Sequence, residues 1–128
     1  MTASALLTAL ALGTAVPPPM PPPASIQVGD RTRQLAYGSY FWAGYRADFG
    51  PPAARRDLPR IVLRRGQRAR FRFGVDPDRL ELTVAGRRFE LTAQKTALWR
   101  ARRGGLAVLE VRYGKSRATY LARFVLAR

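Results

Sequence analysis

The sequence has no cysteine and no histidine, and these two absences exclude several classes of protein. Without them the chain has no disulfide, no zinc finger, no iron–sulfur cluster and no catalytic system built on a cysteine–histidine or serine–histidine pair. The eight acidic residues form neither a general acid–base pair nor a calcium-binding loop, and the sequence has no glycine-rich phosphate loop. We therefore expect a protein that is not an enzyme and that uses no metal and no cofactor.

Negative charge is scarce, because 23 Lys and Arg residues stand against eight Asp and Glu residues, for a formal net charge of +15. A surplus of this size attracts polyanions, and arginine contacts phosphate and carboxylate groups at two points. The chain is nevertheless 47% hydrophobic, which indicates a folded domain rather than a disordered basic tail. Its length of 128 residues suits a single domain. The composition therefore predicts a folded basic domain with acidic partners.

The N-terminal stretch carries no charged side chain before Asp30, and residues 3–16 are small and apolar. Such a stretch is shorter than the roughly 20 residues that cross a bilayer, but it has the length of the apolar part of a secretory signal peptide. Residues 13–15 are of the small kind that a signal peptidase accepts, whereas the usual basic residues upstream are missing. An atypical signal and a start further upstream both stay open. We expect a signal-peptide-like segment over 1–15 and a secreted or cell-envelope location.

Residues 17–23 are proline except for Met20. Such a run forms a polyproline II helix about 20 Å long. It fits either a docking peptide for an SH3-like groove or a stiff spacer, and the absence of flanking basic residues favours the spacer. We expect a Pro-rich linker over 16–25, followed by a basic β-domain over 26–128.

From residue 25 onward, apolar residues recur at every second position. The stretch 68–73 alternates arginine with alanine or phenylalanine, which places the cations on one face of a strand and the apolar side chains on the other. Similar alternation between turn signals predicts strands over 26–28, 34–42, 60–64, 68–73, 79–84, 87–92, 96–100, 106–113 and 117–126. Some of these are expected to be edge pieces, which leaves seven or eight main strands. The pattern contains no amphipathic helix and indicates an all-β fold, an antiparallel sandwich or barrel.

Three hairpins follow from the turn signals. We expect 60–64 and 68–73 to be joined near Gly66, and residues 84–87 to turn tightly with Gly86 at a positive φ. The last two strands are the longest and most apolar, so their hairpin is expected in the interior of a sheet.

Residues 37–45 contain five aromatic side chains, and about 15 residues after Trp42 show no periodicity. One interpretation is a recognition loop, with aromatic rings for stacking and Arg46, Arg55 and Arg56 for anion contacts. The other is that Tyr37, Phe41 or Trp42 fills the core while the rest crosses between sheets. Core packing is favoured for Trp42, and both interpretations stay open for 45–56.

Several short motifs follow one another along the chain. They are Gly-Ser-Tyr-Phe-Trp at 38–42, a proline before Ile-Val-Leu at 61–63, a glycine turn, Arg-Phe-Arg-Phe at 70–73, then Trp99 and a closing strand with Tyr and Phe. In this combination the chain resembles the small immunoglobulin-like domain of uncharacterised secreted bacterial proteins and lipoproteins. That family usually has Gly-Ser-Tyr-Cys-Trp and a second cysteine, whereas Phe41 stands at the first cysteine position here. The resemblance implies an immunoglobulin-like β-sandwich, an extracytoplasmic location and a non-catalytic role.

Two kinds of partner stay open for the predicted basic strand face. An exported domain meets an anionic envelope polymer, lipid headgroups or an acidic protein first. An OB-like five-stranded barrel instead binds single-stranded nucleic acid, by stacking bases on aromatics beside a cationic groove. The arginines also fit a solvated face that keeps sheet edges from pairing. The candidate contact residues are Arg68, Arg70, Arg72, Arg87, Arg88, Tyr45, Arg46, Arg55 and Arg56.

Overall fold

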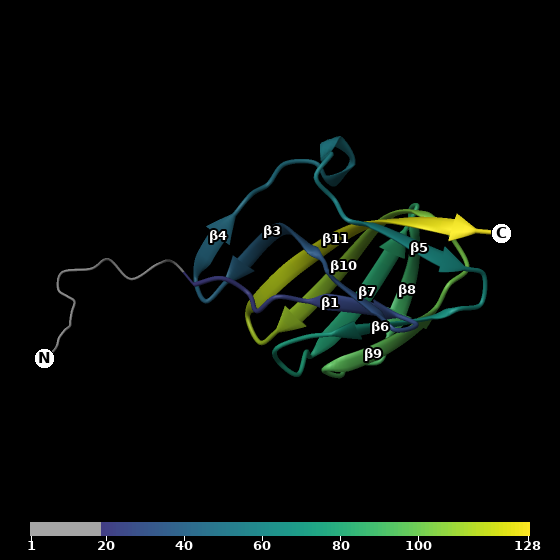
Figure 1. Ribbon diagram of the computed structural model, residues 1–128. Coiled ribbons are helices and arrows are strands. Elements are labelled where there is room, and N and C mark those ends of the chain that lie inside the picture. The colour runs from purple at the N-terminus through teal and green to yellow at the C-terminus, as the bar shows by residue number, and fades with distance from the viewer. Residues whose placement is uncertain (1–18) are drawn as a thin grey trace, which may run out of the picture.

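Two β-sheets packed face to face make up the computed structural model, which describes residues 19–128 (Figure 1). The strands are β1 (Ser25–Val28), β2 (Arg31–Gln34), β3 (Ala36–Trp42), β4 (Tyr45–Ala47), β5 (Arg60–Arg64), β6 (Arg68–Arg72), β7 (Arg79–Val84), β8 (Arg87–Leu91), β9 (Thr96–Arg100), β10 (Gly105–Tyr113) and β11 (Ser116–Ala127). One short 3-10 helix, η1 (Pro52–Ala54), lies between β4 and β5. The predicted all-β sandwich is confirmed. The signal-peptide-like segment predicted over 1–15 lies outside the described residues.

One sheet has four strands, in the order β2-β1-β6-β9, and the other has seven. In the larger sheet the path β4-β3-β11-β10-β7-β8 is antiparallel, and β5 adds to β11 in parallel. Strand β11 therefore has β10 along one side, and β3 followed by β5 along the other. This arrangement confirms that β10 and β11 lie in the interior of a sheet.

The predicted hairpin between 60–64 and 68–73 is wrong. Strand β5 pairs with β11, while β6 pairs with β1 and β9 in the other sheet, so the turn at Gly66 carries the chain from one sheet to the other. Alternation could not distinguish the two cases, because a sheet-to-sheet corner also directs the apolar side chains of both strands into the core. The tight turn at 85–86 is confirmed, with φ of 49° at Ala85 and 81° at Gly86.

Residues 19–128 form eleven strands where seven or eight were expected. The difference comes mainly from short, exposed edge strands. All four residues of β2 are exposed, and β4 buries none of its three residues. Neither strand has the alternation of buried and exposed residues that makes a strand visible in a sequence.

The core lies between the two sheets and consists of the inward residues of both. In the four-stranded sheet these include Ile26, Ala69 and Phe71, and in the larger sheet the inward residues of β7, β10 and β11. Trp99 of β9 packs against Phe89 of β8, with ring centroids 5.5 Å apart. This contact closes one side of the sandwich.

An irregularity in β3 explains where its aromatic residues point. Tyr37 pairs with Tyr120 and Tyr40 pairs with Ala118, so β3 holds one residue more than β11 over this interval. The extra residue is a β-bulge, and it lets Tyr37, Tyr40 and Trp42 all pack against the core. Trp42 does so from the rim, half-buried and stacked on Tyr113 with centroids 5.8 Å apart.

Part of the Pro-rich segment packs onto the sandwich. The Tyr37 hydroxyl donates to the Pro21 carbonyl over 2.8 Å, and the Tyr120 hydroxyl donates to the Pro22 carbonyl over 2.6 Å. Pro21 and Ala24 are buried. Residues 21–24, which the sequence analysis assigned to a linker, therefore belong to the packed unit.

Candidate polyanion-binding face

The outer face of the four-stranded sheet carries a row of arginines, which we call the cationic face: Arg68, Arg70 and Arg72 of β6, with Arg100 of β9. The residues between them on β6, Ala69 and Phe71, are 0% and 1% exposed. Burial of these side chains forces the three arginines outward, as the sequence predicts. Successive arginines on the strand are about 6.8 Å apart, and Arg100 lies directly opposite Arg68 in the register.

No carboxylate stands among the outward positions of these four strands. Their other outward residues are Ser25, Gln27, Thr32, Gln34, Thr96 and Leu98. Two of the arginines are oriented by neighbours, since Arg72 donates to Gln27 Oε1 over 3.2 Å and Arg100 donates to the Gly66 carbonyl over 3.0 Å. The side chains of Arg68 and Arg70 make no hydrogen bond or ion pair with any residue of 19–128. The face therefore keeps most of its guanidinium donors for solvent or a ligand.

The outer face of the seven-stranded sheet is different, because carboxylates lie among the cations on β7, β8 and β10. Arg79 lies 3.3 Å from Glu90, and Arg88 lies 3.4 Å from Glu81. Glu110 occupies the next outward position across from Glu81. These contacts neutralise charge locally, so this face has no uniform potential.

Arg87 and Arg88 were expected to lie near the arginines of β6, but they do not. Both belong to β8, at the edge of the other sheet. The Arg87 guanidinium lies over the Phe89 ring, 5.8 Å from its centroid, and Arg88 is in the ion pair with Glu81. Sequence proximity to the β6 row did not indicate spatial proximity.

Arg55 is committed to the structure of its own loop. Its Nε and Nη2 atoms donate to Asp57 Oδ1 and Oδ2 over 2.8 Å each, and Nη1 donates to the Tyr37 carbonyl over 2.8 Å. The hydrogen bonds from Arg55 lower the pKa of Asp57 to about 2. Arg123 of β11 donates to the Arg55 carbonyl over 2.9 Å and so ties the loop to the sheet. Arg55 is thus a structural residue, and the loop is a packed crossing that arches beyond β11 in Figure 1.

Tyr45 and Arg46 lie on β4, at the far edge of the seven-stranded sheet. Both are exposed, and the Arg46 guanidinium lies 5.8 Å from the centroid of the Phe41 ring. The hollow beside Arg46, of about 300 Å³, also contains Asp48 and Glu110. Hydrogen bonds from the Gly50 amide and the Ser39 hydroxyl lower the pKa of Asp48 and favour its charged form. This site is mixed in charge, and Arg56 is exposed in the following loop.

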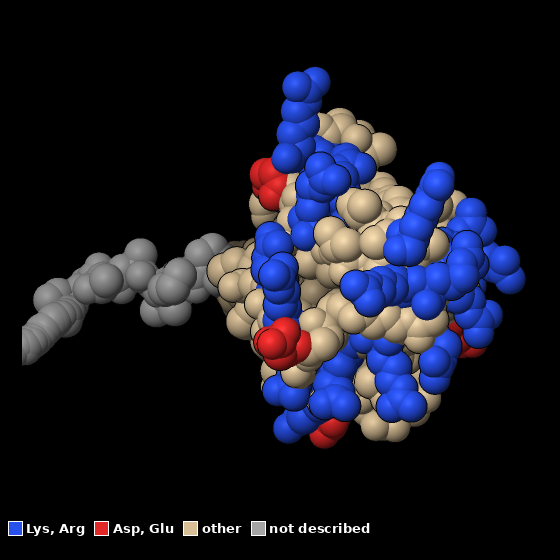
Figure 2. Space-filling model, turned by 45° about the vertical axis from the view of Figure 1, so that its right-hand side comes forward, with Lys and Arg blue, Asp and Glu red and all other residues tan. Residues whose placement is uncertain are grey.

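A second cationic site, not apparent in the sequence, is a groove between β2 and β5. It has a volume of about 480 Å³, and its lining includes one carboxylate, Asp30, together with four arginines and apolar residues: Arg31, Arg33, Arg60, Arg64, Ile26, Val28, Ile61 and Val62. Figure 2 brings this side of the molecule forward and shows Lys and Arg side chains over most of it, with acidic residues as isolated spots. The arginines are two residues apart on β2 and four residues apart on β5, but nothing in the sequence indicates that β2 and β5 face each other.

Membrane-spanning helices and metal-binding groups are two further features that bear on function. Among the described residues, no helix has the length and apolar character needed to cross a membrane. Nor does this part of the chain bring together three His, Cys, Asp or Glu residues in a group suited to a metal ion. Comparisons with protein-family models, with curated proteins and with solved structures each find no match to this chain.

Proposed function

We propose that the protein is a non-catalytic binding module whose cationic face holds an extended polyanion. The observation that carries this proposal is the contrast between the two outer faces. One presents four arginines and no carboxylate at its outward strand positions, whereas the other carries glutamates and has two of its arginines in ion pairs with them. Guanidinium groups in a row offer repeated two-point contacts to phosphate, sulfate or carboxylate groups along a polymer.

The polyanion that fits best is an anionic polymer or lipid surface of the cell envelope. The signal-like N-terminus and the resemblance to secreted immunoglobulin-like domains support export, and an exported domain meets such material first. Single-stranded nucleic acid is less well supported. Binding of single strands relies on aromatic side chains that stack on bases, and the outward positions beside the arginines are Leu98, threonine, serine and glutamine.

The binding test uses long-chain polyphosphate, vesicles with anionic lipid, and an oligothymidylate, each titrated at several salt concentrations. For the oligothymidylate, each phosphate contact contributes about 0.7 to the slope of log K against log salt. The triple variant Arg68→Ala/Arg70→Ala/Arg72→Ala is therefore expected to reduce that slope by about 2. It should weaken binding to polyphosphate and vesicles as well.

The matched control removes the same charge elsewhere, with Arg46→Ala/Arg56→Ala/Arg112→Ala. If charge alone mattered, the two triple variants would lose equal affinity, and the proposal of a specific face would be refuted. Cell fractionation and N-terminal sequencing of the mature protein test the location. A full-length protein found only in the cytosol would contradict the envelope assignment.

A further inference from the structure

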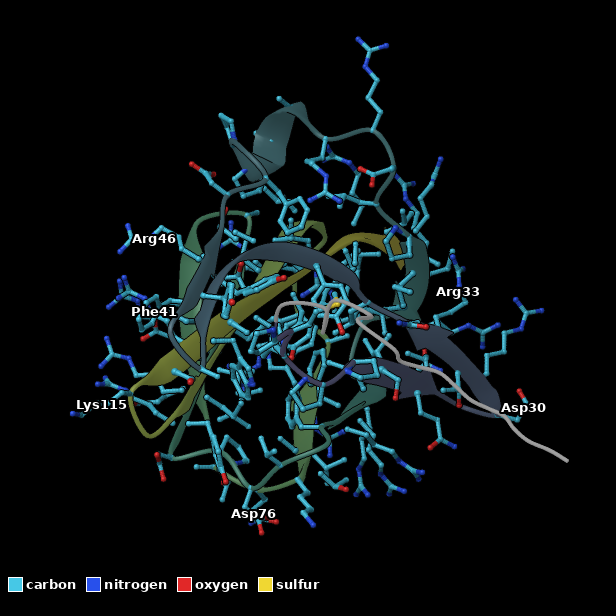
Figure 3. All side chains as sticks on the ribbon, turned by 90° about the vertical axis from the view of Figure 1, so that its left-hand side faces the viewer. Asp30, Arg33, Phe41, Arg46, Asp76 and Lys115 are labelled. Carbon is cyan, nitrogen blue, oxygen red and sulfur yellow. The ribbon has the colours of Figure 1, made fainter. Side chains whose placement is uncertain are left out.

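Strand β2 is an edge strand that lies beside the groove described above. It pairs with β1 on one side and with no strand on the other within residues 19–128. Its arginines line the groove together with Val28 and Val62. Figure 3 shows Arg33 on the same side of the molecule as Asp30 and opposite Arg46, so this site is separate from the hollow beside β4.

The register shows which backbone groups of β2 are open. The Leu35 amide donates to the Ala24 carbonyl over 2.9 Å, and the pairs continue as Ile26 with Arg33 and Val28 with Arg31. In an antiparallel ladder the hydrogen-bonded pairs alternate, so Arg31 and Arg33 direct their backbone groups toward β1. The N–H and C=O groups of Thr32 and Gln34 therefore point to the open edge.

The edge of the facing strand, β5, is partly covered. The Arg64 amide donates to Gln67 Oε1 over 2.9 Å, and the Gln67 amide donates to the Arg64 carbonyl over 2.9 Å. Arg33 Nη1 donates to the Arg60 carbonyl over 3.2 Å. Both backbone groups of Arg64 and the carbonyl of Arg60 are therefore partnered, whereas β2 presents the open groups of Thr32 and Gln34 beside the groove.

We propose that an acidic protein segment binds here as an added β-strand, with its backbone bonded to Thr32 and Gln34. An added strand places alternate side chains about 5 Å from Arg31 and Arg33 on the groove side, where carboxylates would meet the two guanidinium groups. The intervening side chains of the added strand point to the opposite face of the sheet, the face that carries the side chains of Thr32 and Gln34. This is strand addition to a sheet edge, in which the backbone gives affinity and the side chains give specificity.

The charges of the edge favour an acidic partner over a second copy of the chain. If two β2 strands paired with each other, arginines would lie opposite arginines, and like charges directly opposite destabilise a strand pair. Charged edge strands are a common protection against self-association. The same arginines that repel a second copy attract a strand that carries carboxylates.

The test uses a fluorescein-labelled nine-residue peptide that alternates Glu with Val and Thr, titrated with the full chain and followed by anisotropy. A peptide with Lys in place of Glu controls for charge, and a peptide with N-methylated backbone amides at alternate positions controls for the edge bonds. We expect the Glu peptide to bind. Removal of its edge bonds, or the change Arg31→Ala/Arg33→Ala in the protein, should weaken binding about tenfold or more, which corresponds to about 1.4 kcal/mol.

Hydrogen exchange gives a readout of the binding mode. On addition of the peptide, the amides of Thr32 and Gln34 should exchange more slowly, while those of Arg31 and Arg33 keep their rates. The inference is overturned if the Glu peptide fails to bind at low salt, or if the N-methylated peptide binds equally well. It is also overturned if binding is lost in the Arg68→Ala/Arg70→Ala/Arg72→Ala variant but kept in the Arg31→Ala/Arg33→Ala variant. That result would make the cationic face the site that binds the acidic peptide.

Discussion

The attachment of the Pro-rich segment through Tyr120 can be tested by removing one atom. Tyr120 is 3% exposed and its hydroxyl donates to the Pro22 carbonyl over 2.6 Å. The change Tyr120→Phe keeps the buried ring and deletes only the hydroxyl, so packing is retained and the carbonyl loses its partner. A hydrogen bond of this kind contributes about 1 kcal/mol, and a partly buried carbonyl left unpaired raises the cost to about 1–2 kcal/mol.

The assay is urea and thermal unfolding followed by circular dichroism. For a domain of this size, 1 kcal/mol corresponds to a decrease in Tm of about 3–6 °C. The matched control is Tyr113→Phe, because the Tyr113 side chain is 45% exposed and its hydroxyl makes no hydrogen bond within the described part of the chain. The control is expected to unfold like the unmodified protein.

Adding Tyr37→Phe to Tyr120→Phe removes both hydroxyl contacts to the segment. The two tyrosine rings lie 5.7 Å apart, so the two changes are close enough to couple, and their effects need not add. The double variant should also speed proteolysis at residues 21–24. If Tyr120→Phe has the same unfolding midpoints in urea and on heating as the Tyr113→Phe control, the hydroxyl contact contributes nothing to stability. Our account of the segment is then refuted.

Three further changes test other parts of the structure. Gly38→Ala should lower the free energy of unfolding by about 1–3 kcal/mol, because a methyl group there collides with the Thr119 side chain. Adding Thr119→Ala should recover part of that loss in urea unfolding, and an equal loss in the single and double variants would contradict the collision. Ala43→Asn should raise the urea midpoint by the equivalent of about 0.5 kcal/mol, since Ala43 has a φ of 50° that asparagine tolerates better; a lower midpoint would refute the role of the turn. Burial raises the pKa of both Tyr120 and Tyr37, so their stabilising effect is complete below the unfolded pKa of about 10 and is lost as the pH rises above it. Unfolding midpoints measured from about pH 8 to about pH 11, a range that includes the unfolded tyrosine pKa, should fall as the pH rises. They should fall less in Tyr120→Phe.

The parts of the fold that follow from local chemistry could be predicted from the sequence. The alternation over 68–73 predicted both the strand and the outward arginines, because a buried Phe71 leaves its neighbours no other direction. The turn at Gly86 was predicted because glycine adopts a positive φ readily, and the φ of 81° agrees with it. These inferences needed no knowledge of which strands meet.

The parts that depend on pairing between distant strands could not be predicted. Arg87 and Arg88 looked close to the β6 row along the chain, but β6 and β8 belong to different sheets. Arg55 looked like an anion contact because nothing in the sequence indicates that its donors meet Asp57 and the Tyr37 carbonyl. The groove at β2 was missed for the same reason, since it exists only where two sheet edges face each other.

The three-way pairing of β11 has a consequence for the order of folding. This strand emerges from the ribosome after β3, β5 and β10, and it is the partner of all three. Without it, β3 and β4 have no connection to the rest of their sheet, and β5 has no partner strand in the described chain. The larger layer therefore cannot be completed until β11 has been synthesised, although β7, β8 and β10 can pair before it. Assembly that waits for such distant pairings is slow, on a scale of about milliseconds to seconds.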